Sequence, residues 1–96
     1  MQSSRRQRAM VVVMGLDRAQ VEVETEHWRG LGAVVVKTRD AGGCLRISTS
    51  VGPDVIVLDR RVPERLVRLL RAHPVSSDAR IDWLPSPVSV GSWRAA

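Results

Sequence analysis

Short runs rich in valine alternate along this chain with longer segments of mixed apolar and polar residues. The runs lie at 10–14, 33–36, 55–58 and, less strongly apolar, 80–84. Apolar runs of this length, with many β-branched residues, suit strands that are buried on both faces of a parallel sheet. We therefore predict four strands at these positions.

The segments between the runs carry the signals of helices. Asp17, with Gln20 at capping-box spacing, predicts a helix that ends near Arg29, before Gly30. Its apolar pattern is poor and leaves two faces open, one with Ala19 and Val23, the other with Val21, Trp28 and Leu31.

Two further helices are predicted. One spans 41–51, and its expected buried stripe is Ala41, Cys44, Ile47 and Val51. The other opens at Pro63 and Glu64, stops at His73-Pro74, and has an expected core face of Leu66, Leu69 and Leu70.

This order of elements defines a fold class and a domain layout. Strands and helices that alternate in this way predict an α/β protein with an open parallel sheet of about four strands. We expect a basic tail at 1–9, a domain at 10–84 and an irregular segment rich in Pro, Ser and Gly at 85–96.

Composition narrows the environment and the partners. The chain has 96 residues, 44% of them hydrophobic and 26% charged, as in a soluble globular domain, and no apolar run of membrane-spanning length. Its single cysteine, Cys44, agrees with a reducing compartment, so we expect a cytoplasmic protein. The net charge of +5 is compatible with an acidic protein partner or with nucleic acid.

Asp59 is the leading candidate for chemistry. It follows the apolar run 55–58 and so is expected at the carboxyl end of a buried strand, the edge where open α/β sheets bind ligands. The ordinary alternative is a solvated carboxylate that caps the next helix.

The segment PDVIVLDRRVP, residues 53–63, resembles the phosphoacceptor strand of the receiver domains of two-component response regulators. LLRAHP, residues 69–74, is similar to the end of the following helix in that family, and GLGAVVV, residues 30–36, to its turn into the second strand. The resemblance implies a flavodoxin-like fold, a phosphorelay function with a sensor kinase as partner, and Asp59 as the counterpart of the phosphorylated aspartate.

The chain also departs from the receiver pattern. The family has an acidic pair after its first strand that holds Mg²⁺, whereas this chain has Gly15 and Leu16, and its nearest carboxylate is Asp17. Asp59 and Asp17 are thus the candidate ligands of a weak Mg²⁺ site. The usual hydroxyl residue appears as Pro85, and the fifth strand with its lysine has no counterpart. These departures predict a pseudo-receiver, degenerate in phosphoacceptor chemistry, that acts through protein contacts.

Alternative functions remain open. Arg60, Arg61, Arg65 and Arg68 are candidates for binding a partner, or else the solvated side of a helix. With the basic amino terminus they could instead make the chain a small nucleic-acid-binding protein. An enzyme ranks lowest, because Asp59 has no visible partner acid, base or metal site. An edge and an uncovered apolar face of a four-stranded sheet would favour a homodimer.

Overall fold

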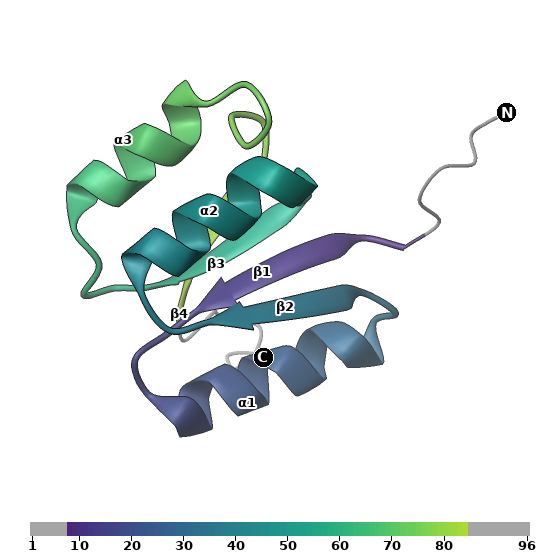
Figure 1. Cartoon of the computed structure of the whole chain (residues 1–96). Helices are drawn as coiled ribbons and strands as arrows, with labels where there is room; N and C mark the ends of the chain where they lie inside the picture. Colours follow the sequence, from purple (N-terminus) through teal and green to yellow (C-terminus); the bar gives the residue numbers. More distant parts are fainter. Residues whose placement is uncertain (1–7, 85–96) are drawn as a thin grey trace, which may run out of the picture.

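Four parallel strands form one open sheet in the order β2-β1-β3-β4, as the computed structural model of the chain shows for residues 8–84 (Figure 1). The strands are β1 (Met10–Met14), β2 (Val34–Thr38), β3 (Val55–Asp59) and β4 (Arg80–Leu84). The predicted fold class and all four strands are confirmed. The second strand starts one residue later than expected and continues through Lys37 and Thr38.

The central strands explain why the valine-rich runs are so apolar. β1 pairs with β2 on one side and with β3 on the other, so Val12 lies opposite both Val36 and Ile56. Every residue of β3 is buried, as are four of the five in β1. A strand with neighbours on both sides and helices on both faces has no polar side to present.

Three helices cover the two faces of the sheet. α1 (Arg18–Gly30) packs on one face against β1 and β2, whereas α2 (Ala41–Val51) lies on the other face beside α3 (Glu64–Ala72) (Figure 1). Two apolar clusters result. One joins α2 and α3 to the sheet around Ile56 and Leu58, and the other joins α1 to it around Val11 and Val57.

The buried faces of the helices differ in part from the expected ones. In α1 the buried residues are Val21, Glu24 and Thr25, while Val23 is exposed, so the face of Val21 and Trp28 is the one that packs inward. Leu31, expected on the same face, is exposed because it lies at the C-cap, beyond the last helical residue. The apolar pattern was poor because two of the inward positions carry polar side chains. The indole Nε1 of Trp28 donates a hydrogen bond of 2.8 Å to Glu24.

Two further side chains are corrections to the predicted core. Val51 was expected in the buried stripe of α2, but it is exposed because it is the last residue of the helix, before left-handed Gly52 (φ 63°). Ser48, one turn after Cys44, is buried instead. In α3, Leu66 and Leu70 are buried, whereas Leu69 points away from the core and is exposed.

The structure describes residues 8–84, so the predictions for the two ends of the chain are largely untested. The predicted irregular segment 85–96 and most of the predicted basic tail 1–9 lie outside the described residues. Within residues 8–84, no helix is long and apolar enough to span a membrane. In the same range, β4 is hydrogen-bonded to β3 only and forms an edge of the sheet.

Candidate functional site

Asp59 lies where the fold places ligand sites in proteins of this architecture. It is the last residue of β3, and its side chain is only 4% exposed. The strand order reverses between β1 and β3, because β1 leads to β2 on one side while β3 leads to β4 on the other. Crevices outside the carboxyl ends of strands at such a switch point are the usual binding positions in open α/β sheets.

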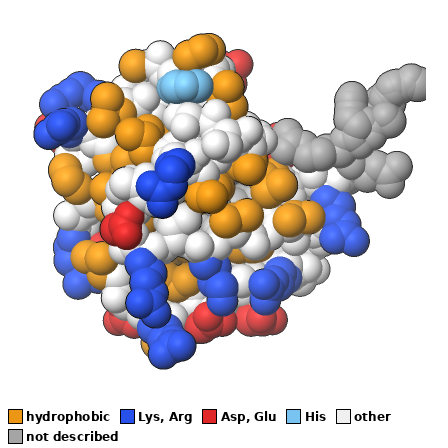
Figure 2. All heavy atoms as spheres, in the orientation of Figure 1, with side chains coloured by type: hydrophobic (Ala, Val, Ile, Leu, Met, Phe, Trp, Pro, Cys, Tyr) orange, Lys and Arg blue, Asp and Glu red, His pale blue; other side chains and the backbone are white. Residues whose placement is uncertain are grey.

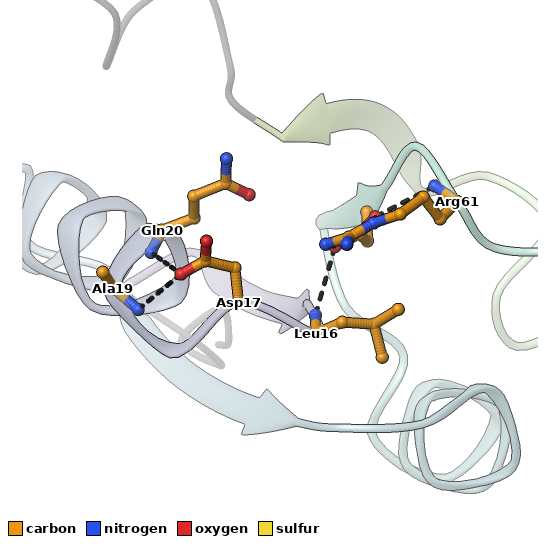
Figure 3. A network of polar contacts seen from close by, with 6 residues as sticks. Leu16, Asp17, Ala19, Gln20 and Arg61 are labelled. Atoms are coloured by element: carbon orange, nitrogen blue, oxygen red, sulfur yellow. Dashed lines mark hydrogen bonds and ion pairs between the residues drawn. The ribbon is translucent and has the colours of Figure 1, made fainter.

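Arg61 holds both oxygens of the Asp59 carboxylate (Figure 3). Its Nε donates to Oδ1 and its Nη2 to Oδ2, each at 2.8 Å. The Arg61 backbone N–H donates to Oδ1 at 2.9 Å, and the backbone N–H of Leu16, after β1, donates to Oδ2 at 3.1 Å. Asp59 therefore accepts four hydrogen bonds, all from groups of its own chain.

These contacts fix the charge state of the carboxyl group. The hydrogen bonds from the Arg61 side chain lower the pKa of Asp59 strongly, burial raises it, and the backbone donors of Arg61 and Leu16 lower it again. The lowering contributions win, so the pKa of Asp59 lies well below its ordinary range. At neutral pH the site is a carboxylate neutralised by a guanidinium in bidentate geometry.

Asp17 serves a different purpose. Its Oδ1 accepts hydrogen bonds from the backbone N–H groups of Ala19 (2.9 Å) and Gln20 (3.3 Å), so Asp17 is the N-cap of α1, as predicted (Figure 3). It still acts on the site at a distance, because its charge raises the pKa of Arg61, although less than Asp59 does. Asp17 and Asp59 are thus both used within the fold, one by a helix end and the other by Arg61.

This arrangement does not fit a magnesium site. Mg²⁺ requires oxygen ligands in near-octahedral geometry, with one or two carboxylates free to bind it. The Asp59 oxygens are occupied by N–H donors, and Gly15 and Leu16 bring no side-chain oxygen to the edge of the sheet. Among the residues that the structure describes, no group of three or more His, Cys, Asp and Glu side chains could hold a metal ion.

The arginines predicted as a partner-binding patch do not form one uniform surface. Arg61 precedes α3 and turns back to Asp59. Arg68 lies one turn after Glu64 on α3 and forms an ion pair with it, with 3.7 Å between Arg68 Nη1 and Glu64 Oε1. Both side chains are largely exposed. Arg60 and Arg65 are exposed. What the sequence reasoning missed is that Arg61 is the partner of Asp59. Their spacing of two residues just after a strand end was the available signal.

A second feature of the same sheet edge was not expected. A pocket of about 580 Å³ lies between the start of α1 and the end of β2. Its lining consists of Gly15, Leu16, Arg18, Val21, Glu22, Lys37, Thr38 and Arg39. Residues that follow the carboxyl ends of two adjacent parallel strands meet at one edge, and this rule could have brought the cations after the first and second strands together.

Comparison with known proteins supports the receiver-like fold. No family model matches the sequence, and no curated protein matches it significantly. Among solved structures, a proposed response regulator from Chloroflexus aurantiacus J-10-fl superimposes with a TM-score of 0.72 at 17% identity, over 94% of this chain and 80% of that one. The N-terminal domain of a response regulator receiver protein from Methanoculleus marisnigri JR1 gives 0.70 at 15% identity, over 91% and 77%. The chain therefore has the fold of a response regulator receiver domain.

Proposed function

We propose that this chain is a receiver-like signalling domain of the two-component type that has lost phosphoacceptor chemistry and acts through contacts with other proteins. The fold supports the class. The observation that supports the rest is the bidentate ion pair between Arg61 and Asp59, the residue that the sequence resemblance makes the counterpart of the phosphoacceptor. The domain would work as a binding module of fixed conformation and not as an enzyme.

The chemistry of phosphoryl transfer gives the reason. Such transfer depends on positioning and on cations, chiefly Mg²⁺, that neutralise charge developing on the phosphoryl oxygens. Here a guanidinium already neutralises the carboxylate, and the nucleophilic oxygens are engaged by four donors. An incoming phosphoryl group would have to displace Arg61 from the carboxylate, so Asp59 does not offer a free nucleophile.

Intact-mass analysis with a small acyl-phosphate donor tests this part of the proposal. We expect no phosphate-sized adduct on the wild type, with or without Mg²⁺, in protein shown by circular dichroism to be folded. Asp59→Asn is the matched control, since it keeps the shape of the side chain and removes the nucleophile. An adduct that requires both Mg²⁺ and Asp59 would show a working phosphoacceptor and overturn the loss of chemistry.

Protein contacts are the second part of the proposal, with a sensor kinase, another signalling protein or a second copy as partner. The edge strand β4 offers unpaired backbone groups within the described residues, together with half-buried Ile81 and Trp83. Exposed strand edges and apolar surface favour association. Sedimentation at low and high salt should reveal a salt-insensitive complex, either a homodimer or one with a supplied kinase.

Nucleic-acid binding is the competing function. Sedimentation at low and high salt, repeated with DNA, distinguishes it from the protein-binding proposal. Arg60 and Arg65 are exposed and could contact phosphates. Binding of DNA through such contacts would weaken steeply as salt is raised. Salt-sensitive association with DNA, with no protein complex at either salt concentration, would replace the signalling proposal by a basic binding protein.

A further inference from the structure

The pocket between α1 and β2 is lined by three cationic side chains. Arg18 stands in the first turn of α1, Lys37 in β2 and Arg39 directly after β2, and all three line the pocket. Among the described residues of the lining, Glu22 is the single acid. Three positive charges against one negative charge leave the pocket with a net positive lining, at the edge of the sheet where α/β proteins bind ligands.

The acid is already engaged. Lys37 Nζ donates to Glu22 Oε2 at 2.8 Å across the groove between strand and helix. The pKa of Glu22 is lowered mainly by this hydrogen bond and by the charge of Lys37, and the charge of Arg18 lowers it further. Arg18 therefore acts on the same small region. The charge of Glu22 is matched by Lys37, which leaves the charges of Arg18 and Arg39 without an acid among the residues that line the pocket.

The other lining residues indicate that a ligand also has an apolar part. Val21 forms part of the wall, and Leu16, which is 56% exposed, lies at the same pocket. Ligand sites typically have volumes of about 300–1,000 Å³ and combine apolar walls with a few polar groups that fix orientation. A pocket of about 580 Å³ is within this range and is larger than a bare inorganic anion requires.

We propose that this pocket binds a small organic phosphate, with the phosphate between Arg18 and Arg39 and the apolar or ring portion against Leu16 and Val21. Guanidinium groups suit this task because their N–H donors match phosphate oxygens in bidentate geometry. Lys37 remains with Glu22 and closes the side of the pocket. The site adjoins Asp59 at Leu16, whose backbone N–H donates to that carboxylate. The proposed phosphate contacts are Arg18 and Arg39, so the proposal does not depend on whether Asp59 accepts a phosphoryl group.

A titration followed by two-dimensional NMR of the amide groups tests the proposal. Adenosine monophosphate, inorganic phosphate and adenosine serve as probes up to about 10 mM, where a site with a Kd of about 1 mM is nearly filled. We expect adenosine monophosphate to shift the amides of Arg18, Thr38 and Arg39, inorganic phosphate to shift them with lower affinity, and adenosine to leave them unchanged. No shifts with adenosine monophosphate would overturn the proposal.

Charge variants make the test specific to this pocket. Arg39→Gln removes a proposed contact and should weaken binding about tenfold, because hydrogen bonds to charged groups are among the stronger ones. Arg46→Gln is the matched control, because this substitution removes the same charge from the chain. Arg46 is exposed on α2, which lies on the opposite face of the sheet from the pocket. Equal weakening by both variants would mean a general attraction to a cationic protein and would overturn the site.

One variant should act in the opposite direction. Glu22→Gln removes the acid from the lining and frees Lys37, so affinity for adenosine monophosphate should rise several-fold. Unchanged or weaker binding in Glu22→Gln would contradict the assigned role of the cations. Single-stranded DNA added in competition distinguishes the sources of phosphate. If DNA binds without displacing adenosine monophosphate, DNA uses another surface, and the small-molecule site stands. If DNA displaces adenosine monophosphate and inorganic phosphate does not, the proposed small-molecule site is overturned.

Discussion

Replacing Arg61 with alanine should destabilise the domain far more than replacing its neighbour Arg60. Arg61→Ala removes two of the four hydrogen bonds to Asp59 and leaves a carboxylate that is 4% exposed without its cation. The backbone donors of Arg61 and Leu16 remain. Arg60 is exposed, so Arg60→Ala is the matched control and should change stability by less than about 0.5 kcal/mol.

The size of the effect follows from the burial of the two partners. Removing one partner of a fully buried ion pair costs about 3–5 kcal/mol, because the other charge is left uncompensated. Arg61 is 61% exposed, so solvent screens the pair and water can reach the vacated side, which reduces the expected loss to about 2 kcal/mol. For a domain of this size, that corresponds to a fall in Tm of roughly 8–16 °C.

The two members of the pair should be unequal. Asp59→Asn keeps one side-chain oxygen, which can accept from only one of the two backbone donors because these bind different carboxylate oxygens. It also leaves an arginine that water can solvate, so we expect a loss of about 1 kcal/mol, smaller than that of Arg61→Ala. Chemical denaturation of wild type, both single variants and the double variant measures the coupling between the partners. Equal stability of Arg61→Ala and Arg60→Ala would refute the importance of the ion pair.

The acid dependence of the same variants has a definite sign. Arg61 lowers the pKa of Asp59 in the folded state, so the pair contributes its full stability above the unfolded pKa of about 3.9 and loses it as the pH falls below that value. The advantage of wild type over Arg61→Ala should therefore be constant near neutral pH and shrink in acid. An advantage that stayed unchanged down to about pH 2 would contradict this linkage.

Three other substitutions test the packing around the site. Gly15→Ala would place a Cβ 2.5 Å and 2.8 Å from side chains of α1 and β4, so thermal unfolding should show a loss of about 1–3 kcal/mol, whereas Gly30→Ala, with open space around it, should show none. Asp17→Ala removes the cap of α1 and should cost about 0.5–2 kcal/mol, measured by circular dichroism on heating; a smaller loss would mean that the N-cap is dispensable. Trp28→Phe removes a donor from buried Glu24 and should cost about 1–3 kcal/mol in urea denaturation, and an unchanged midpoint would show that this hydrogen bond contributes nothing.

Much of the fold was predictable because the central strands have one chemical character. The runs containing Val12 and Ile56 are apolar at every position, and strands buried on both faces leave no other pattern. The N-cap at Asp17 was equally readable, since capping depends on local spacing. The inward face of α1 was not, because Glu24 and Thr25 are buried there, and burial of polar side chains depends on partners that periodicity does not reveal.

The candidate site was only half predictable. The position of Asp59 at the end of a buried strand followed from the apolar run before it. The role of Arg61 did not follow from the sequence, because Arg61 was interpreted with Arg60, Arg65 and Arg68 as a partner-binding candidate or a solvated side chain, whereas it turns back to Asp59. The cationic pocket depends on Arg18 and Arg39 meeting across two strands, which a sequence pattern shows only once the strand order is known.

The ion pair at the end of β3 also determines where the counter-charge of Asp59 comes from. Its two charges lie two residues apart, so the pair forms within one turn and needs no distant segment to supply the cation. A metal ion or a phosphoryl group comes and goes with its concentration, but a cation built into the chain is present in every molecule. The charge of Asp59 is therefore balanced by the chain itself, at any concentration of metal ion or phosphate in the surroundings.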